Sequence, residues 1–379
     1  MHPESASQMA GRHSARTAPP FHGSYRPQDV RFLLTPIALE PTGVAEKERL
    51  IQSGERHYSE MLSGESAPSA RYMAVFEQSF AANRRRLAEG ILDLAAIIDA
   101  ARHGEITLVS LARAGTPIGV VLKHTLEGVF RRAVGHYSLS IIRDRGIDAR
   151  ALAFILGPEG RDETGLVFVD GWTAKGVIAG ELARSIGRFN RHQGRHLDAS
   201  LFSLTDLAGV GVAPCDQDYL IPSCILNATI SGLVSRSVLR PDQDGDDFHG
   251  CVYYRDLAQA DRSVWFVEQV LSDVRAALAS GYRPRPTAVD PAPARERAAR
   301  VLTDIGSGFG IRDARLIKPG RGEPTRDLRP PLPQRLLVRD PPCAVVPHLL
   351  QLADEKAVHW EVEPSLPYQA ISLIKGIAP

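Results

Sequence analysis

Cysteine is scarce in this sequence, and long apolar runs are missing. Its 379 residues include four cysteines, Cys215, Cys224, Cys251 and Cys343, and no two of them form a Cys-x-x-Cys pair. This spacing indicates neither a disulfide framework nor a structural zinc site. No run approaches the roughly 18 to 20 apolar residues that span a bilayer. We therefore expect a cytoplasmic protein without a membrane partner.

An excess of charge of one sign is also missing. The 45 basic and 44 acidic residues leave a formal net charge of +1. This balance gives no global electrostatic reason to expect nucleic acid as the main partner, so any polyanion site must be local. The hydrophobic content of 44% is typical of a globular protein, and the length exceeds that of most single cores. We therefore expect one large domain and one smaller domain.

Composition and periodicity divide the chain into four parts. We expect residues 1–23 to form a disordered tail, because they are polar and lack a signal-like apolar stretch. Residues 24–282 alternate apolar strands with amphipathic helices, which predicts a parallel sheet flanked by helices. Residues 283–310 are rich in proline and predict a linker or exposed crossover. Residues 311–379 predict a small α/β domain. The strands expected in the large domain are 106–111, 137–142, 166–169 and 201–204.

The segment after the strand 166–169 has the pattern of a phosphate cradle. A loop of small residues there opens into a helix at Val177. A helix start offers free amides and a positive dipole end to an anion, and glycine allows close backbone approach. We expect Asp170 to hold ribose hydroxyls, and an ordinary turn capped by Asp170 is the alternative. The candidate binding residues are Asp170, Gly171, Thr173, Ala174, Lys175 and Gly176.

A second small-residue loop follows the strand 106–111, and Pro117 suits the first turn of the helix after it. The alternative is a tight turn in which Arg113 makes a surface salt bridge. Ligands of open α/β sheets bind outside the carboxyl ends of the strands, so both loops are expected to face one crevice. The candidates for holding a second phosphate are Ser110, Arg113, Ala114, Gly115 and Thr116.

A charged turn follows the strand 137–142. Arg143 and Arg145 are expected to neutralise charge released in a displacement reaction, and with Asp170 they are the predicted catalytic residues. The alternative is a solvated turn in which Asp144 pairs with its neighbours. After the strand 201–204, Asp206 is expected to cap a turn, and contact with a base or a metal is the alternative.

The two loops and their order resemble type I phosphoribosyltransferases. Residues from about 24 to 282 resemble the phosphoribosyltransferase-like proteins of tellurium-resistance gene clusters, also named the StiP-type cysteine protease family. The segments that carry the resemblance are Leu111-Ala-Arg-Ala-Gly-Thr-Pro, His136-Tyr-Ser-Leu-Ser-Ile-Ile-Arg-Asp-Arg-Gly-Ile-Asp, Phe168-Val-Asp-Gly-Trp-Thr-Ala-Lys-Gly and Asp218-Tyr-Leu-Ile-Pro-Ser.

This resemblance implies a stress-linked phosphoribosyltransferase, of the glycosyltransferase class, that acts on a ribosyl phosphate such as a nucleotide or nucleoside-like metabolite. Pyrophosphate would bind at 113–116 and ribose 5-phosphate at 170–176, as in phosphoribosyl pyrophosphate (PRPP). Magnesium would arrive with the pyrophosphate, and no metal site made of protein side chains is expected. Typical members of the transferase class carry two adjacent acids, whereas here Gly171 follows Asp170.

Two other functions stay open. The protease name of the family implies a nucleophilic cysteine activated by a histidine, for which Cys224 and His249 are the candidates. The alternatives for these two residues are a buried inert thiol and a core histidine. The second functional alternative is a non-catalytic nucleotide or RNA sensor that keeps the loops.

The smaller domain carries a local excess of basic residues. Between Ile311 and Asp340 there are eight basic and four acidic residues. Lys318, Arg321 and Arg326 are the candidates for contact with RNA, and a solvated basic face is the alternative. The last seventy or so residues resemble the Pelota-type RNA-binding domain. The segments Pro319-Gly-Arg-Gly-Glu-Pro-Thr-Arg, Arg335-Leu-Leu-Val-Arg and Tyr368-Gln-Ala-Ile-Ser-Leu-Ile-Lys carry this resemblance.

Overall fold

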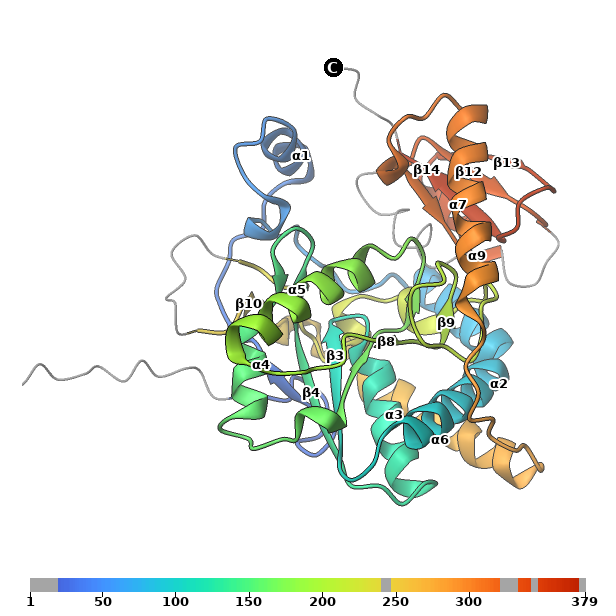
Figure 1. Ribbon diagram of the computed structural model, residues 1–379. Coiled ribbons are helices and arrows are strands. Elements are labelled where there is room, and N and C mark those ends of the chain that lie inside the picture. The colour runs from blue at the N-terminus through green and yellow to red at the C-terminus, as the bar shows by residue number, and fades with distance from the viewer. Residues whose placement is uncertain (1–19, 240–246, 321–332, 342–346, 375–379) are drawn as a thin grey trace, which may run out of the picture.

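A parallel sheet lies at the centre of the larger domain (Figure 1). The computed structural model describes residues 20–239, 247–320, 333–341 and 347–374. Neighbouring strands along the main path of this sheet all pair in parallel, and a short strand, β5 (Gly146–Ile147), pairs antiparallel with β4. The expected parallel α/β sheet is thereby confirmed. In sheet order the strands are β1 (Arg31–Leu33), β4 (Val134–Ile142), β3 (Ile106–Ala112), β6 (Leu166–Val169) and β8 (Leu201–Phe202).

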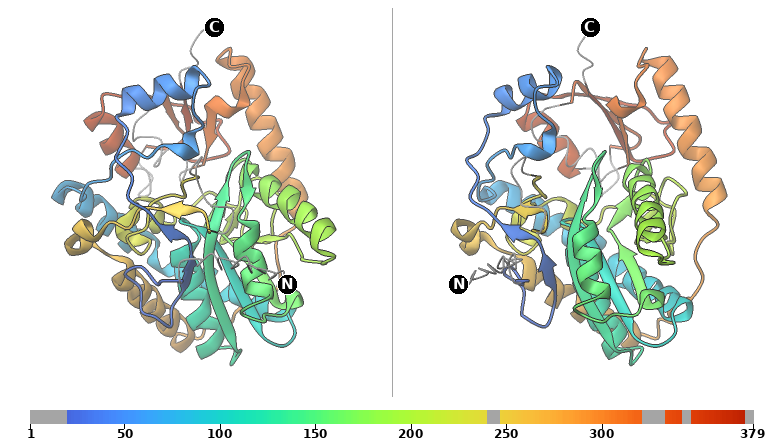
Figure 2. Two further views of the ribbon diagram at one scale, coloured as in Figure 1. Left: turned by 90° about the vertical axis from the view of Figure 1, so that its left-hand side faces the viewer. Right: turned by 60° about the vertical axis from the view of Figure 1, so that its left-hand side comes forward.

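Helices cover both faces of the sheet (Figures 1 and 2). Successive side chains of a strand point to opposite faces, so β3 contributes Ile106 and Leu108 to one core and Val109 and Leu111 to the other. Its nearly continuous apolar sequence suits a strand buried on both sides. The first core contains α2 (Ala70–Ala101), α3 (Thr116–Gly128) and α6 (Ser263–Ala279), and the second contains α4 (Ala149–Leu156) and α5 (Val177–Gln193).

Side-chain caps mark several helix starts. Ser69 accepts the backbone N–H of Tyr72 at the start of α2, and Asp148 accepts two backbone N–H groups at the start of α4. The stretch 283–310, predicted as a linker, contains helix α7 (Pro291–Gly308). Proline is tolerated in the first helical turn because the first amides have no partner within the helix, so Pro291 begins α7 behind the cap residue Asp290.

A second sheet organises the C-terminal domain. Its order is β11–β14–β12–β13, in which β12 and β13 are parallel and the other pairs are antiparallel. Helix α7 packs against this domain through Val301 and Ile305. The remaining elements of the C-terminal domain are β11 (Ile317–Pro319), β12 (Arg335–Val338), α9 (Pro347–Glu355), β13 (His359–Val362) and β14 (Ala370–Leu373).

The two domains are in direct contact, with the C-terminal domain lying beside α7 in Figure 1. Leu207 of the larger domain is part of the apolar core of the smaller one. The hydroxyl of Tyr368 donates to the carbonyl of Leu207 at 3.2 Å, and the N–H of Gln369 donates to Asp218 at 2.8 Å. The smaller domain therefore rests on the loops that follow β8.

Two further short strands and one helix lie outside the central sheet. Strand β2 (Thr35–Pro36) pairs with β10 (Gly250–Cys251), and helix α1 (Val44–Gln52) projects from the larger domain in Figure 1. Among the described residues, no helix combines the length and the apolar character needed to cross a membrane.

Candidate functional site

The two loops predicted to bind one ligand lie side by side at the carboxyl edge of the sheet. They follow β3 and β6, which are adjacent parallel strands. A side chain on Gly115 would overlap the carbonyl oxygen of Val169, and one on Gly171 would meet the carbonyl of Ala114 at 4.0 Å. The expected proximity of the loops is thus present, and glycine at position 115 permits the close backbone approach.

The loop hydroxyls make bonds within the protein. The Oγ of Ser110 lies 2.8 Å from Nε2 of His136 and donates to the carbonyl of Gly115 at 3.2 Å. The Oγ1 of Thr116 lies 2.8 Å from the Oγ of Ser138. All of these side chains are buried, so in this structure their hydroxyls bind neighbouring residues.

The loop 170–176 contacts the C-terminal domain. Lys175 donates to the carbonyls of Ala314 at 2.9 Å and Arg315 at 3.3 Å, both in the C-terminal domain. Gly176 adopts a positive φ of 75° at the start of α5, a conformation that favours glycine. Asp170 accepts the N–H of Gly171 at 2.8 Å, and Ala174 is buried.

Part of this loop is a strand. Residues Trp172–Thr173 form β7, which pairs with β9 (Thr205–Asp206). The hydroxyl of Thr173 donates to Asp206, which also accepts the backbone N–H groups of Ala208, Val210 and Gly211. Asp206 therefore caps a turn, as the sequence predicted.

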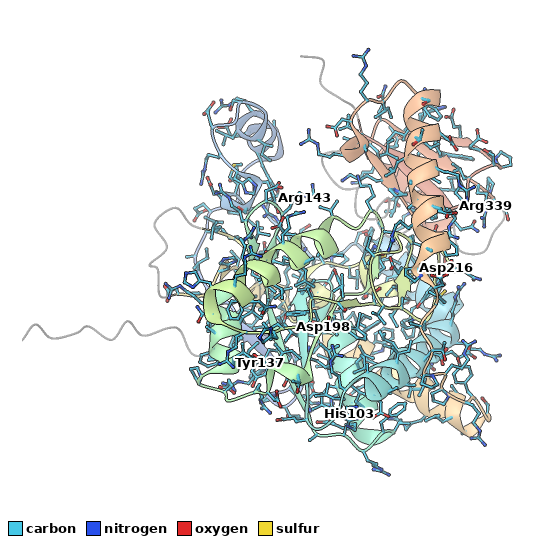
Figure 3. The ribbon with its side chains drawn as sticks, in the orientation of Figure 1. His103, Tyr137, Arg143, Asp198, Asp216 and Arg339 are labelled. Carbon is cyan, nitrogen blue, oxygen red and sulfur yellow. The ribbon has the colours of Figure 1, made fainter. Side chains whose placement is uncertain are left out.

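The predicted arginines have different surroundings. Arg113 forms an ion pair with Glu65 at 2.5 Å and donates to the carbonyl of Val234 at 3.1 Å. The backbone N–H of Arg143, which is labelled in Figure 3, donates to the hydroxyl of Tyr58 at 2.9 Å. The Nε of Arg143 is buried and has no hydrogen-bond partner within the described structure. Arg145 is exposed and lies 3.8 Å from Glu60.

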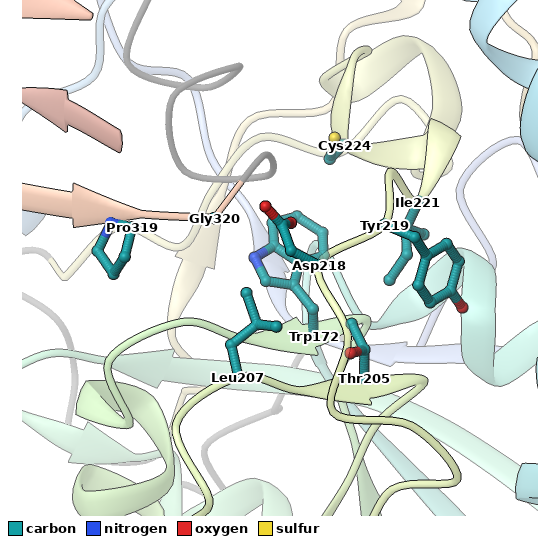
Figure 4. Close-up of a pocket in the computed structure, with 9 residues that line it drawn as sticks. All are labelled: Trp172, Thr205, Leu207, Asp218, Tyr219, Ile221, Cys224, Pro319 and Gly320. Atoms are coloured by element: carbon teal, nitrogen blue, oxygen red, sulfur yellow. The ribbon is translucent and has the colours of Figure 1, made fainter. Parts of the chain in front are cut away.

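A small pocket of about 260 Å³ lies between the domains (Figure 4). Cys224, a buried residue at the end of the 3₁₀ turn Pro222–Cys224, is one of its lining residues. The paired strands β7 and β9 contribute Trp172 and Thr205, and the C-terminal domain contributes Pro319 and Gly320. The other lining residues are Leu207, Asp218, Tyr219 and Ile221.

His249 makes its hydrogen bonds elsewhere. Its Nδ1 lies 2.7 Å from the Oγ of Ser140, and its backbone N–H donates to Asp148 at 2.7 Å. Burial lowers the pKa of His249, which favours the neutral imidazole, while the carboxylate of Asp148 opposes this shift. In this structure the two predicted protease residues therefore have separate sets of neighbours.

Two other cysteines differ in accessibility. Cys251 is fully buried, and burial raises the pKa of its thiol to about 12, so this thiol is inert at neutral pH. Cys215 is half-buried, and a guanidinium nitrogen of Arg86 donates to its sulfur at 3.5 Å. This pair could not be predicted from the sequence, because its members are 129 positions apart. Cys343 lies outside the described residues.

The residues predicted to contact RNA are only partly described. Lys318 lies on β11 and pairs with Ser372 of β14, whereas Arg321 and Arg326 are outside the described ranges. The nearby Arg335 forms an ion pair with Glu361 at 3.1 Å, so its charge is partly balanced.

No cluster of three or more histidine, cysteine, aspartate or glutamate side chains suited to a metal ion occurs within the described ranges. Magnesium carried by a diphosphate would not need such a cluster. The expectation of magnesium therefore stays a prediction.

Comparison with known proteins identifies the family. Residues 23–271 match the model of the tellurite-like stress resistance cysteine protease StiP, and residues 296–376 match that of the PELOTA RNA binding domain. A protein of Acinetobacter baylyi named cysteine protease StiP is 38% identical over 374 residues, covering 94% of this chain and 95% of that protein. This chain belongs to the StiP family. The resemblances to the StiP family and to the Pelota domain are thereby confirmed.

Membership of the StiP family corrects the main functional prediction. A phosphoribosyltransferase acting on a ribosyl phosphate was the wrong interpretation, because both the relative and the family model carry the name of a cysteine protease, the stated alternative. The loops do not determine the reaction, since one fold supports many chemistries. The transferase interpretation fails for a physical reason: neighbouring residues already bond polar groups that were expected to bind phosphate. These groups belong to Ser110, Thr116 and Lys175.

Proposed function

We propose that this chain is a cysteine protease. The observation that carries the proposal is the 38% identity to the protein named cysteine protease StiP, which extends over 94% of this chain. Identity over nearly the whole length includes both domains and the segments that form the pocket.

Cys224 is the proposed nucleophile. Cys224 and Cys251 are both buried, and of the three described cysteines Cys224 is the one that lines the pocket between the domains. The thiolate would bond to the carbonyl carbon of the scissile peptide and release the amine, and water would then hydrolyse the thioester.

The base that removes the thiol proton requires its own test. Among the described lining residues, Asp218, Tyr219 and Cys224 are the titratable ones. A histidine is the usual base for a nucleophilic cysteine. Because His249 is bound to Ser140, alanine variants of several histidines should be compared. The histidines for this panel are His57, His249 and His348.

A matched set of cysteine variants tests the assignment. Hydrolysis of a fluorescent protein substrate should be lost in Cys224→Ser and retained in Cys215→Ser and Cys251→Ser, because serine lacks the nucleophilic thiolate. Mass spectrometry after iodoacetamide treatment should show substrate protecting Cys224 from alkylation. Full hydrolysis by Cys224→Ser would disprove the assignment, and loss of activity in Cys215→Ser alone would transfer the role to the thiol beside Arg86.

We also propose that residues 296–376 bind RNA, because they match the PELOTA RNA binding domain model. Lys318 is the described candidate for this contact. A filter-binding assay at several salt concentrations should show weaker binding and a smaller salt slope for Lys318→Gln. Arg312→Gln is a control for loss of one positive charge elsewhere. Equal binding by all three proteins would remove Lys318 from the interface.

A finer assignment concerns the fold alone. We infer that the larger domain has the type I phosphoribosyltransferase-like fold without the transferase reaction. The parallel order β1–β4–β3–β6–β8 and the two adjacent loops after β3 and β6 support this inference. Superposition on transferases of that type, with these loops in register, would test it.

A further inference from the structure

Four cationic residues form what we call the cation cluster: Arg236 and Arg143, which adjoin Tyr58, and Lys47 and Arg113, whose charges act on or are acted on by Arg236. The guanidinium of Arg236 lies 5.5 Å from the centre of the Tyr58 ring, and the Tyr58 hydroxyl accepts the backbone N–H of Arg143. Burial lowers the pKa of Lys47 to about 8, and the charge of Arg236 adds to this shift. Burial also lowers the pKa of Arg236, and the positive charge of Arg113 adds to this decrease. Positive charges therefore lie near one another in a partly buried region.

Among the described residues, neutral groups hold two of these cations. Arg236 donates to the carbonyls of Tyr58, at 2.8 Å, and Met61, and Lys47 donates to the hydroxyl of Ser63 at 3.2 Å. Within the described structure only Arg113 of the cluster forms an ion pair, so the other three cations lack a carboxylate partner. Desolvated charge without a counter-ion is costly, and such clusters are found where proteins bind ions of opposite charge.

Unsatisfied polar groups adjoin the cluster. The hydroxyl of Tyr254 and the Nε of Arg143 are buried without a hydrogen-bond partner in the described part of the chain. Burial raises the pKa of Tyr254 to about 12, with Glu65 adding to the shift and Arg113 opposing it, which places this hydroxyl in the cluster. Both groups can donate to an oxygen of a ligand.

One carboxylate already occupies part of the cluster. Glu65 accepts from Arg113 at 2.5 Å and from the backbone N–H of Ala228 at 3.0 Å, and its side chain is only 13% exposed. A guanidinium and a backbone amide are the groups that bind a carboxylate strongly.

Glu65 belongs to an extended segment that we call the strap, residues 61–65. The strap lies outside any helix or strand, and the cluster contacts it repeatedly. Arg236 donates a hydrogen bond to the carbonyl of Met61, and Lys47 donates one to the hydroxyl of Ser63. Arg113 donates one to the carboxylate of Glu65. Between these contacts Leu62 is buried in an apolar core with Tyr254. A bound acidic peptide would have the same features. Its extended backbone would be held by polar contacts, an apolar side chain would enter a pocket, and a carboxylate would pair with a cation.

We propose that the cation cluster is a binding site for an extended peptide segment bearing a carboxylate, and that the strap is its internal occupant. Its use as a substrate site rests on the proposed protease function. The amide that holds Glu65 belongs to Ala228, on the segment that directly follows the proposed nucleophile Cys224. An acidic substrate would displace Glu65 and meet the cations that lack a carboxylate.

Peptide binding to the full chain tests this site without cleavage if all proteins carry Cys224→Ser. The probe is a fluorescent peptide with the sequence Met-Leu-Ser-Gly-Glu-Ser-Ala-Pro-Ser, compared with its glutamine counterpart by anisotropy. Glu65→Gln should tighten binding of the acidic peptide about tenfold or more, because it releases Arg113 from its internal charge-assisted bond. The glutamine peptide should bind Glu65→Gln about tenfold more weakly than the acidic peptide does.

Two controls separate binding from structural effects. Glu55→Gln removes an exposed carboxylate paired with Arg49 and should leave the affinity unchanged. Arg143→Gln, introduced where Glu65 is intact, should weaken binding of the acidic peptide about threefold or more, since the arginine Nε has no bond to lose. This second variant decides the question if Glu65→Gln does not fold.

Equal affinity for the acidic and glutamine peptides would overturn the site. The same conclusion follows if Glu65→Gln lowers the unfolding midpoint without raising affinity, because Glu65 would then be only a structural ion-pair partner. Failure of the protease proposal is distinguishable, since it appears as absence of hydrolysis by the parent protein, whether or not the Cys224→Ser proteins bind the peptides.

Discussion

Gly119 on helix α3 provides a sharp test of how the larger domain is packed. A methyl group at this position would overlap the Oγ of Ser110 and the Nε2 of His136, and would lie 2.9 Å from the Cε1 of His136. These two side chains form a buried hydrogen bond of 2.8 Å, and neither can move into solvent. Gly119→Ala should therefore separate them or push α3 away from the sheet.

The size of the effect follows from three contributions. Overpacking costs about 1–3 kcal/mol, and a broken buried hydrogen bond costs about 1–3 kcal/mol. The higher helix propensity of alanine returns about 1 kcal/mol. We expect Gly119→Ala to lower the free energy of unfolding by about 2–4 kcal/mol.

Urea unfolding followed by tryptophan fluorescence measures this change. Gly128→Ala in the same helix is the matched control, because a methyl group there meets no atom within 4 Å, and it should be neutral or stabilising by up to about 1 kcal/mol. Adding Ser110→Ala to Gly119→Ala should recover part of the loss, since the overlapping hydroxyl is gone. If the free energy of unfolding of Gly119→Ala is within about 0.5 kcal/mol of that of the parent protein, then α3 does not pack on Ser110 and His136 as closely as the structure shows.

Two further predictions concern pH and the domain interface. Burial lowers the pKa of His136 to about 4 from the ordinary 6.5, so below pH 6.5 the unfolded chain takes up a proton that the folded chain refuses. The free energy of unfolding should fall as the pH decreases from about 6.5 to 4, by up to about 1.4 kcal/mol per pH unit. Unfolding curves at pH 7 and pH 5 should show a smaller loss of stability for His136→Gln than for the parent protein. Gly320 has a φ of 82°, and a methyl group there would lie 2.6 Å from Leu207 across the domain interface, whereas Gly310 has a φ of 66° and open space around it. Gly320→Ala should therefore release the C-terminal domain to limited proteolysis faster than Gly310→Ala, and equal rates would mean that backbone strain alone acts.

The elements of the larger domain could be read from local patterns. Apolar runs bounded by turn residues predicted β3, β4 and β6, because strands buried on both faces need continuous apolar sequence. The helix starts after β3 and β6 were also predictable from glycine and proline. The proline-rich stretch before residue 310 was interpreted as a linker, but its later prolines lie in the first turn of helix α7.

The partners of the site residues could not be read from the sequence. Arg113 pairs with Glu65, which lies 48 positions earlier, and Lys175 binds carbonyl groups 139 and 140 positions later. Local periodicity carries no information about such contacts. The same limit explains why the loops suggested a phosphate site although their hydroxyls bond within the protein.

The family motifs and the alternation of strands and helices were sufficient by themselves to establish the StiP relationship and a parallel sheet with helices on both sides. Helical faces repeat every three to four residues and strand faces every two, so these periods are visible in the amino-acid order. The enclosure of Cys224 between two domains, the separate surroundings of His249 and the strap across the cation cluster were decided by tertiary packing. These features depend on which distant side chains meet when apolar surfaces are buried, and one sequence does not encode that in any local pattern.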